Sequence, residues 1–248
     1  EQQYLHEITY RFARERYPIL TTKITVQLKK ELDVISKLGL SGYFLIVWDI
    51  CRFAKDNQIL CQGRGSAANS VTCYALEITA VDPIELNLLF ERFLSKERGE
   101  WPDIDIDFPS GAKRESVIQY VYQKYGPSGA AMTANVITFR DRSALRESGL
   151  ALGFSQEQID LVAKTSGHWS DIEETETLTQ HFEQAGISAS HHRSKLWIQM
   201  AQALLHRPRH LGQHSGGMVI AAGRLDQVVP IEPASMAKRK VIQWDKDD

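Results

Sequence analysis

Residues 101–108 read Trp-Pro-Asp-Ile-Asp-Ile-Asp-Phe, a strict alternation of acidic and apolar side chains. A period of two predicts a β-strand over 102–108, with Asp103, Asp105 and Asp107 on one face about 6.5–7 Å apart. Neighbouring carboxylates at that spacing repel by roughly 2–3 kcal/mol at an effective dielectric constant near 20. The strand is therefore either an amphipathic edge strand with a solvated acidic face or a site for hard cations such as Mg²⁺.

A glycine-rich turn, Gln-Gly-Arg-Gly-Ser at 62–66, lies upstream of the acidic strand. It follows a predicted short strand over 59–61 and precedes a predicted helix from Ala67 to Leu76. Glycine lets the backbone approach a ligand, Ser66 stands where a helix N-cap is expected, and Arg64 suits phosphate. The segment matches neither the Walker A pattern nor GxGxxG, and an ordinary serine-capped turn is the alternative interpretation.

The turn and the acidic strand suit two parts of the same ligand, a metal-bound triphosphate. The Gly65–Ser66 turn suits a triphosphate, and the aspartates suit the metal ions that bridge one. Arg92 and Arg98 lie between the two segments in the sequence and are candidates for phosphate contacts. Their alternative role is surface pairing with Glu91 or Glu97.

The organisation of the chain predicts an α+β fold. Helical periodicity dominates the first third, continues over 43–55 and returns over 113–125. A strand is expected over 130–138, only helical signals over 141–207, with a capping box formed by Ser155 and Gln158, and strands again over 217–222 and 241–244. The simplest account is a sheet that is interrupted by an all-helical insert and then resumes.

Composition narrows the functional class. The chain has 248 residues, 43% of them hydrophobic, with 29 basic and 31 acidic residues and a net charge of −2. The hydrophobic content is sufficient for a buried core. The near-balanced charge excludes a histone-like polycation, so any contact with nucleic acid must use local basic patches.

Three cysteines without a CxxC pair argue against a disulfide scaffold or a zinc ribbon and suit a reducing cytoplasm. Membrane spans and secretion signals are not expected, and the missing initiator methionine suggests a piece of a longer protein.

Seven segments in one order resemble a known family. They are SGYFLIVWDICRFAKDNQI at 41–59, QGRGSAANS at 62–70, ITAVDPIELNLLFERFLSKER at 78–98, WPDIDIDF at 101–108, VIQYVYQKYG at 117–126, HSGGMVIA at 214–221 and QWDKDD at 243–248. The chain resembles the alpha subunit of bacterial DNA polymerase III, a C-family polymerase. Asn69, residues 139–149 and residues 215–217 make the resemblance strongest to its error-prone, damage-inducible paralogue.

The resemblance implies a palm of the polymerase-β nucleotidyltransferase type, a mixed sheet with helices, carrying an inserted all-helical thumb. The expected boundaries are 1–134 for the first part of the palm, 135–212 for the thumb and 213–248 for the second part of the palm.

The implied activity is template-directed DNA synthesis with two Mg²⁺ ions, which makes the protein a transferase of DNA replication, DNA repair and translesion synthesis. Asp103 and Asp105 are the implied catalytic metal ligands, with Asp107 in support. The implied contacts to the nucleotide phosphates come from Gly65, Ser66, Arg64, Arg92 and Arg98. The family's third catalytic aspartate lies beyond a segment like 243–248, so the chain by itself is expected to be inactive.

The thumb is expected to bind primer–template DNA through contacts with the DNA phosphates. The candidate DNA-binding residues are Arg193, Lys195, Arg207, Arg209 and His214. The alternative for each is a solvated surface. The resemblance further implies a bacterial cytoplasmic location, with a sliding clamp and accessory translesion proteins as partners through regions outside this chain.

Two other functions remain open on the residues alone. A polymerase-β-type nucleotidyltransferase acting on another acceptor shares the turn and the acidic strand, and a catalytically silent DNA-binding module shares the basic patches. Template-dependent incorporation distinguishes the first from a polymerase, and metal binding helps to distinguish the second.

Overall fold

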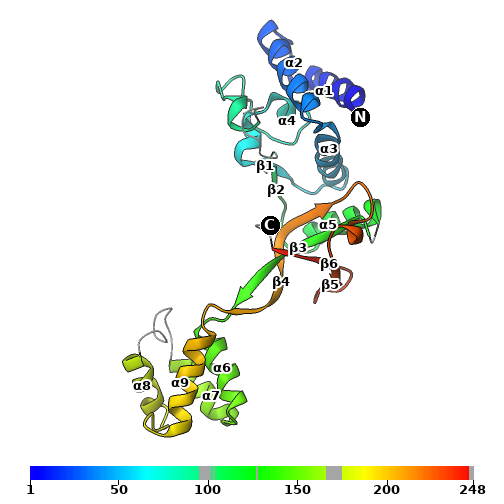
Figure 1. Cartoon of the computed structure of the whole chain (residues 1–248). Helices are drawn as coiled ribbons and strands as arrows, with labels where there is room; N and C mark the ends of the chain where they lie inside the picture. Colours follow the sequence, from blue (N-terminus) through cyan, green and yellow to red (C-terminus); the bar gives the residue numbers. More distant parts are fainter. Residues whose placement is uncertain (95–101, 103, 127, 166–174, 246–248) are drawn as a thin grey trace. The chain divides into compact units, whose positions relative to one another are not determined.

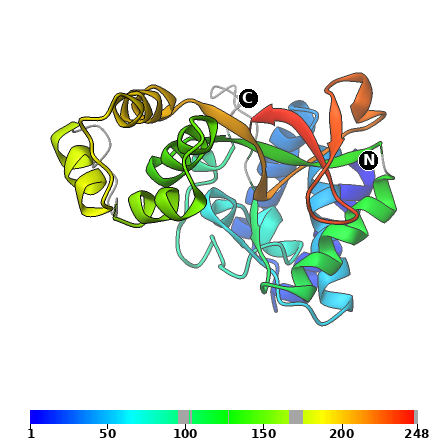
Figure 2. The same ribbon diagram turned by 90° about the horizontal axis from the view of Figure 1, so that it is seen from below.

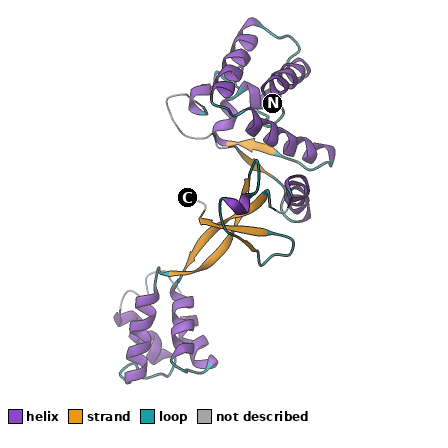
Figure 3. Cartoon of the chain, turned by 45° about the vertical axis from the view of Figure 1, so that its right-hand side comes forward, coloured by secondary structure: helices purple, strands orange, loops and turns teal. Residues whose placement is uncertain are grey.

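The computed structural model describes residues 1–94, 102, 104–126, 128–165 and 175–245. Its contacts divide the chain into two units, residues 1–126 and 127–248. Helices and strands occur in both units, so the predicted α+β class is confirmed (Figure 3).

The first unit is mainly helical. Thr21 caps its second helix by accepting a hydrogen bond from the Ile24 amide, and Gly39, at φ +70°, follows the end of that helix. Within the described residues no single helix is long and apolar enough to cross a membrane. Helices α2 (Thr22–Lys37) and α3 (Ser41–Asp56) meet the length and composition criteria only when taken together, and they are bent by 114° relative to each other. The elements of this unit are α1 (Gln2–Arg16), α2 (Thr22–Lys37), α3 (Ser41–Asp56), β1 (Gln62–Arg64), a 3₁₀ helix (Gly65–Asn69), α4 (Val71–Ala75), a 3₁₀ turn (Phe90–Arg92), β2 (Asp105–Asp107) and α5 (Ala112–Tyr125).

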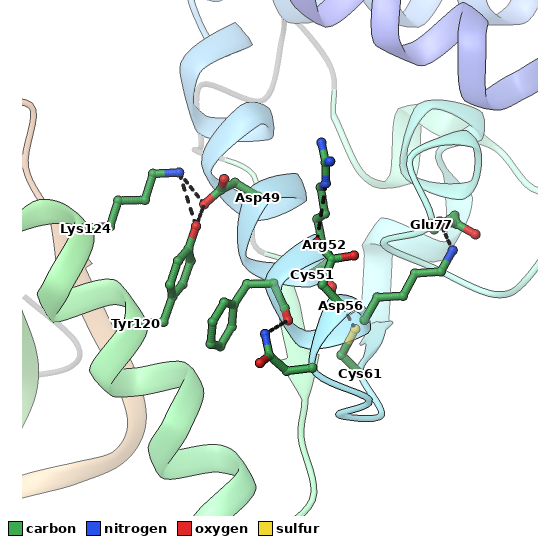
Figure 4. Close-up of polar contacts among 11 residues, drawn as sticks. Asp49, Cys51, Arg52, Asp56, Cys61, Glu77, Tyr120 and Lys124 are labelled. Atoms are coloured by element: carbon green, nitrogen blue, oxygen red, sulfur yellow. Dashed lines mark hydrogen bonds and ion pairs between the residues drawn. The ribbon is translucent and has the colours of Figure 1, made fainter.

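Polar and aromatic side chains attach helix α5 to α3, and two of these contacts are drawn in Figure 4. The Tyr120 hydroxyl donates to an Asp49 carboxylate oxygen at 2.6 Å, and the Lys124 ammonium pairs with the same oxygen at 2.5 Å. The ring of Tyr120 also stacks on Phe53, with centroids 3.9 Å apart. Because α5 follows β2 directly, this attachment holds the chain as it leaves the acidic strand.

The second unit contains a four-stranded mixed sheet in the order β4-β3-β6-β5. Strands β3 and β4 are antiparallel, β3 and β6 are parallel, and β5 and β6 are antiparallel. The long β3–β4 pair leads into a group of four helices, as Figures 1 and 2 show. The elements are β3 (Ala130–Thr138), α6 (Asp141–Ala151), α7 (Gln156–Thr165), α8 (Thr175–Gln184), α9 (His192–Leu204), β4 (Pro208–Ile220), a 3₁₀ turn (Leu225–Gln227), β5 (Ile231–Pro233) and β6 (Lys240–Asp245).

The four helices have their own apolar core around Trp197. Its indole is fully buried, its Nε1 donates to the Leu145 carbonyl at 2.8 Å, and its ring meets Phe182 edge-on. A Cβ added to Gly149 would lie 2.5 Å from the indole, so the close packing of α6 on α9 requires glycine there. The helical insert between two paired strands is thus present as predicted.

Several predicted elements match the structure closely, and others are corrected. The helix over 43–55 is α3, and the strand over 130–138 is β3. The capping box is confirmed, because the Ser155 amide donates to the Gln158 side chain and the Gln158 amide donates to the Ser155 hydroxyl.

Three boundaries were wrong. The strand expected over 59–61 lies at 62–64, the acidic strand is shortened to Asp105–Asp107, and β4 begins at Pro208 rather than at 217. In the first case Ile59 is used instead in a buried contact with Ala54 and Val117.

Candidate active site

The glycine-rich turn and the acidic strand lie side by side in the first unit. Strands β1 and β2 form an antiparallel two-stranded sheet in which Arg64 is opposite Asp105 and Gly63 is opposite Ile106. Asp105 therefore lies next to the residue that enters the Gly65–Ser66 turn. The predicted proximity of the turn to this aspartate is confirmed, whereas Asp103 lies outside the described residues.

The face shared by these residues is charged and open to solvent. Arg64 Nε lies 3.1 Å from Asp107 Oδ1, and Arg64 Nη2 lies 3.5 Å from Asp105 Oδ2. All three side chains are at least half exposed. On the opposite face Ile104 and Ile106 pack against the apolar core, so the alternation predicted from the sequence is confirmed for this part of the strand.

Glycine is required twice in the turn, for different reasons. A Cβ on Gly63 would lie 2.6 Å from the Ile78 carbonyl oxygen, which accepts the Gly63 amide hydrogen at 2.7 Å. Gly65 has φ +69°, a conformation that costs an L-residue energy, and the space beside its Cα is open. The turn is therefore backed by the core on one side and accessible on the other.

The expected role of Ser66 as a helix N-cap is wrong. Residues Gly65–Asn69 form a 3₁₀ helix without a side-chain cap, and the α-helix starts only at Val71. Ser70 is its N-cap, with Oγ accepting the Cys73 amide at 3.1 Å. The argument that a helix dipole favours an anion at Ser66 therefore fails, and what remains is the open backbone of the turn together with Arg64.

A buried glutamate that sequence reasoning missed holds the residues just after this turn. Glu31 of α2 is fully buried, and its carboxylate accepts the Ser70 hydroxyl at 2.9 Å, the Val71 amide at 3.0 Å and the Thr72 amide at 2.9 Å. Burial raises the pKa of Glu31, while the hydrogen bonds it accepts, including one from Gln27, act in the opposite direction. The sequence did contain one sign that Glu31 is buried, because it lies three residues after Leu28 within the apolar stripe of α2.

The arginines proposed for phosphate contacts are placed unequally. Arg92 is exposed and ends the Phe90–Arg92 turn, which contacts the 3₁₀ helix of the glycine-rich turn. Glu91, its expected alternative partner, is paired with Lys30. Arg98 lies outside the described residues, as does Glu97.

The candidate DNA-binding residues lie on two elements of the second unit. On α9, Arg193 donates to the Leu152 carbonyl at 2.5 Å and covers the Phe154 ring, while Lys195 is exposed. Arg209 of β4 pairs with Glu147 at 2.6 Å.

The other two candidates lie just before and within β4. Arg207 is exposed just before β4, and His214 Nδ1 accepts the Gly217 amide at 2.5 Å. Arg193, Arg209 and His214 thus already have structural contacts.

The side chains of Asp105 and Asp107 fit a hard divalent cation by their chemistry. Their oxygens share an exposed face, and the Arg64 guanidinium pairs with both carboxylates there and offsets part of their charge. Across the described residues, which exclude Asp103, no group of three or more histidine, cysteine or acidic side chains is close enough to enclose a metal ion.

Comparison with known proteins identifies the family. A family model described as the bacterial DNA polymerase III alpha NTPase domain matches residues 3–248. A protein of Bordetella parapertussis named error-prone DNA polymerase is 49% identical over 246 residues, which cover 99% of this chain and 23% of that protein. Proteins of the same name from Anaeromyxobacter dehalogenans and Dechloromonas aromatica are 49% and 47% identical over 98% and 99% of the chain.

The chain spans about a quarter of the length of these relatives. The match nevertheless extends over almost all of its residues, including the glycine-rich turn and the acidic strand. The resemblance inferred from the sequence is confirmed, and the chain belongs to the bacterial DNA polymerase III alpha family.

Proposed function

We propose that this chain carries part of the active site of a bacterial error-prone DNA polymerase, which extends a primer by transferring nucleotides from dNTPs under the direction of a template. The relatives named error-prone DNA polymerase support the reaction class. The structural observation that carries the proposal is the β1–β2 pair, in which Asp105 faces Arg64 at the entrance to the Gly65–Ser66 turn.

Asp103 and Asp105 are the proposed ligands of two Mg²⁺ ions. When bound, these ions lower the pKa of the primer 3′-hydroxyl and neutralise the phosphate oxygens and the pyrophosphate leaving group. Asp107 takes a supporting part, since it also pairs with Arg64. Asp245 of β6 is a poor candidate for a further ligand, because its Oδ2 accepts the Val136 amide at 2.7 Å.

The chain's own residues bind and orient the triphosphate. Gly65 and Ser66 offer an open backbone, and Arg64 offers a guanidinium that can exchange its carboxylate partners for phosphate oxygens. Arg92 and Arg98 are proposed to contact the same phosphates. In this arrangement Arg64 compensates the charge of Asp105 and Asp107 before the nucleotide arrives.

The helices α6–α9 are the proposed thumb, within the boundaries 135–212, and the parts over 1–134 and 213–248 are the proposed palm. Contacts to the DNA backbone are assigned to Arg193, Lys195, Arg207, Arg209 and His214. Sliding-clamp and accessory contacts belong to other regions of the whole protein, and the proposed location is the bacterial cytoplasm.

The test is incorporation by a full-length protein containing this chain, supplied with primer–template DNA, Mg²⁺ and one dNTP at a time. Incorporation of the complementary nucleotide opposite each of the four template bases supports the proposal. Addition that ignores the template indicates a nucleotidyltransferase with another acceptor. Binding of DNA without incorporation indicates a silent module, and either of these results overturns the proposal.

A further inference from the structure

A cavity of about 700 Å³ lies in the first unit, and its lining does not include the Gly65–Ser66 turn. It is lined by α1, by α3, by the segment that leads into β1 and by residues 76–80. Two cysteines, Cys51 and Cys61, are among its lining residues, and neither has a part in the proposed polymerase reaction. The third, Cys73, is completely buried and does not line it.

The two lining cysteines are in contact through the Cys61 thiol and the Cys51 backbone. Cys61 is half-buried and its Sγ donates to the Cys51 carbonyl oxygen at 3.8 Å, a contact seen in Figure 4. Cys51 lies on α3 with 4% of its surface exposed. All three cysteines are free thiols.

The surroundings make the two thiols unequal. A side-chain hydrogen bond with Cys51 is the main cause that lowers the pKa of Cys61 to about 7, with Lys55 acting in the same direction and burial and Glu77 opposing it. The same hydrogen bond, together with burial, raises the pKa of Cys51. Burial likewise raises the pKa of Cys73. Cys61 therefore has thiolate character at neutral pH, while Cys51 stays a neutral thiol.

We propose that Cys61 is a peroxide-reactive thiol and that Cys51 resolves its oxidised form as a reversible intramolecular disulfide. In the first step the Cys61 thiolate attacks one oxygen of hydrogen peroxide, the O–O bond breaks, and sulfenic acid and hydroxide form. In the second step the Cys51 sulfur attacks the sulfenic sulfur, and the hydroxyl leaves as water with the Cys51 proton. The two sulfurs are oxidised and the peroxide is reduced to water.

The location of the pair gives the oxidation a structural consequence. Cys61 directly precedes β1, the strand that carries Arg64, whereas Cys51 is one turn and a half from the end of α3. The disulfide would tie the start of β1 to α3. This part of the inference rests on the proposed function, but formation of the disulfide does not.

The experiment treats the reduced full-length protein with hydrogen peroxide, blocks the remaining thiols and maps the peptides by mass spectrometry. The expected product is a Cys51–Cys61 disulfide that dithiothreitol reverses. The Cys73→Ser variant should form the same disulfide. In the Cys51→Ser variant the disulfide should be lost, and a dimedone adduct should appear on Cys61.

A measurement on the unmodified protein covers the case in which the Cys51 variant does not fold. Under native conditions at pH 7, iodoacetamide should alkylate Cys61 at least about tenfold faster than Cys73, because the thiolate is the reactive form. A Cys61 that stays reduced at peroxide levels that oxidise free cysteine would overturn the proposal. So would a Cys51–Cys73 disulfide as the main product, or equal alkylation of Cys61 and Cys73.

Discussion

Arg64 and Asp105 face each other across the β1–β2 pair, with Nη2 and Oδ2 3.5 Å apart. The same guanidinium also contacts Asp107, so one cation is shared by two carboxylates on an exposed face. The positive charge of Arg64 reduces the repulsion between these two carboxylates, which we propose to lie at a metal-binding and phosphate-binding site.

Replacing Arg64 with alanine should weaken nucleotide binding without unfolding the chain. The ion pairs are exposed, so their loss should change the free energy of unfolding by less than about 1 kcal/mol. Losing charged hydrogen bonds to phosphate, worth roughly 1.5–3 kcal/mol, should raise KM for the dNTP about 10- to 150-fold. Steady-state primer extension measures this, with Arg52→Ala as the control, since Arg52 is similarly exposed and pairs with Asp56. An unchanged KM in Arg64→Ala would argue against the phosphate role.

Replacing Glu31 with alanine should destabilise the first unit. The Ser70 hydroxyl and the Val71 and Thr72 amides would lose their acceptor in a buried place, where each orphaned donor costs about 1–3 kcal/mol. We expect a total loss of about 3–5 kcal/mol in denaturant unfolding, and a smaller loss in Glu31→Gln, which keeps one acceptor oxygen. The control is Glu85→Ala, an exposed acid. Equal stability of Glu31→Ala and Glu85→Ala would contradict the assignment.

The pH dependence of the unfolding free energy should also show that the pKa of Glu31 is raised in the folded chain. Burial raises its pKa in the folded chain above the value of about 4.3 expected when unfolded, so the folded state binds the proton more tightly. The resulting stabilisation is complete below the unfolded pKa and is lost as the pH rises through the folded pKa. The unfolding free energy of the wild type, minus that of Glu31→Gln, should therefore fall over this range. A difference that rises with pH would show that the hydrogen bonds outweigh burial.

Substituting Gly149 with alanine tests the packing of the four-helix insert. Alanine is the better helix former by up to about 1 kcal/mol, yet its Cβ would lie 2.5 Å from the Trp197 ring. We expect a net destabilisation of about 1–3 kcal/mol from overpacking, measured by denaturant unfolding. Gly216→Ala is the control, because a Cβ there meets no atom within 4 Å. A stabilised Gly149→Ala variant would mean that α6 and α9 do not pack this closely.

The parts of the fold that local patterns determine were predictable from the sequence. Helix α3 and strand β3 were located to within about two residues because each carries its own period of apolar residues. The predicted position of β1 was three residues too early, because tertiary contacts decide which residues form this strand. Gly63 pairs with Ile106 and bonds to Ile78, and none of these contacts is visible in a local window.

The candidate site was predictable only in its charged and glycine residues. The alternation of aspartates placed Asp105 and Asp107 on one face, and the turn was recognised from Gly63 and Gly65. The cap was assigned to Ser66 instead of Ser70, because the local sequence offers two serines and only the fold decides between them. Glu31 lies in the apolar stripe of α2, but its partners, some forty residues away, could not be identified from that stripe.

The most direct test of the central claim is the single-turnover rate of primer extension by full-length protein carrying Asp105→Ala, compared with Asp56→Ala. Asp56 is an exposed acid of the same unit that pairs with Arg52 and is not one of the proposed metal ligands. We predict that Asp105→Ala lowers the rate at least about 1,000-fold, equivalent to about 4 kcal/mol, with an unchanged unfolding transition, and that Asp56→Ala retains the wild-type rate. A rate within about tenfold of the wild type in a folded Asp105→Ala protein would contradict the claim that the face shared by Arg64, Asp105 and Asp107 is catalytic.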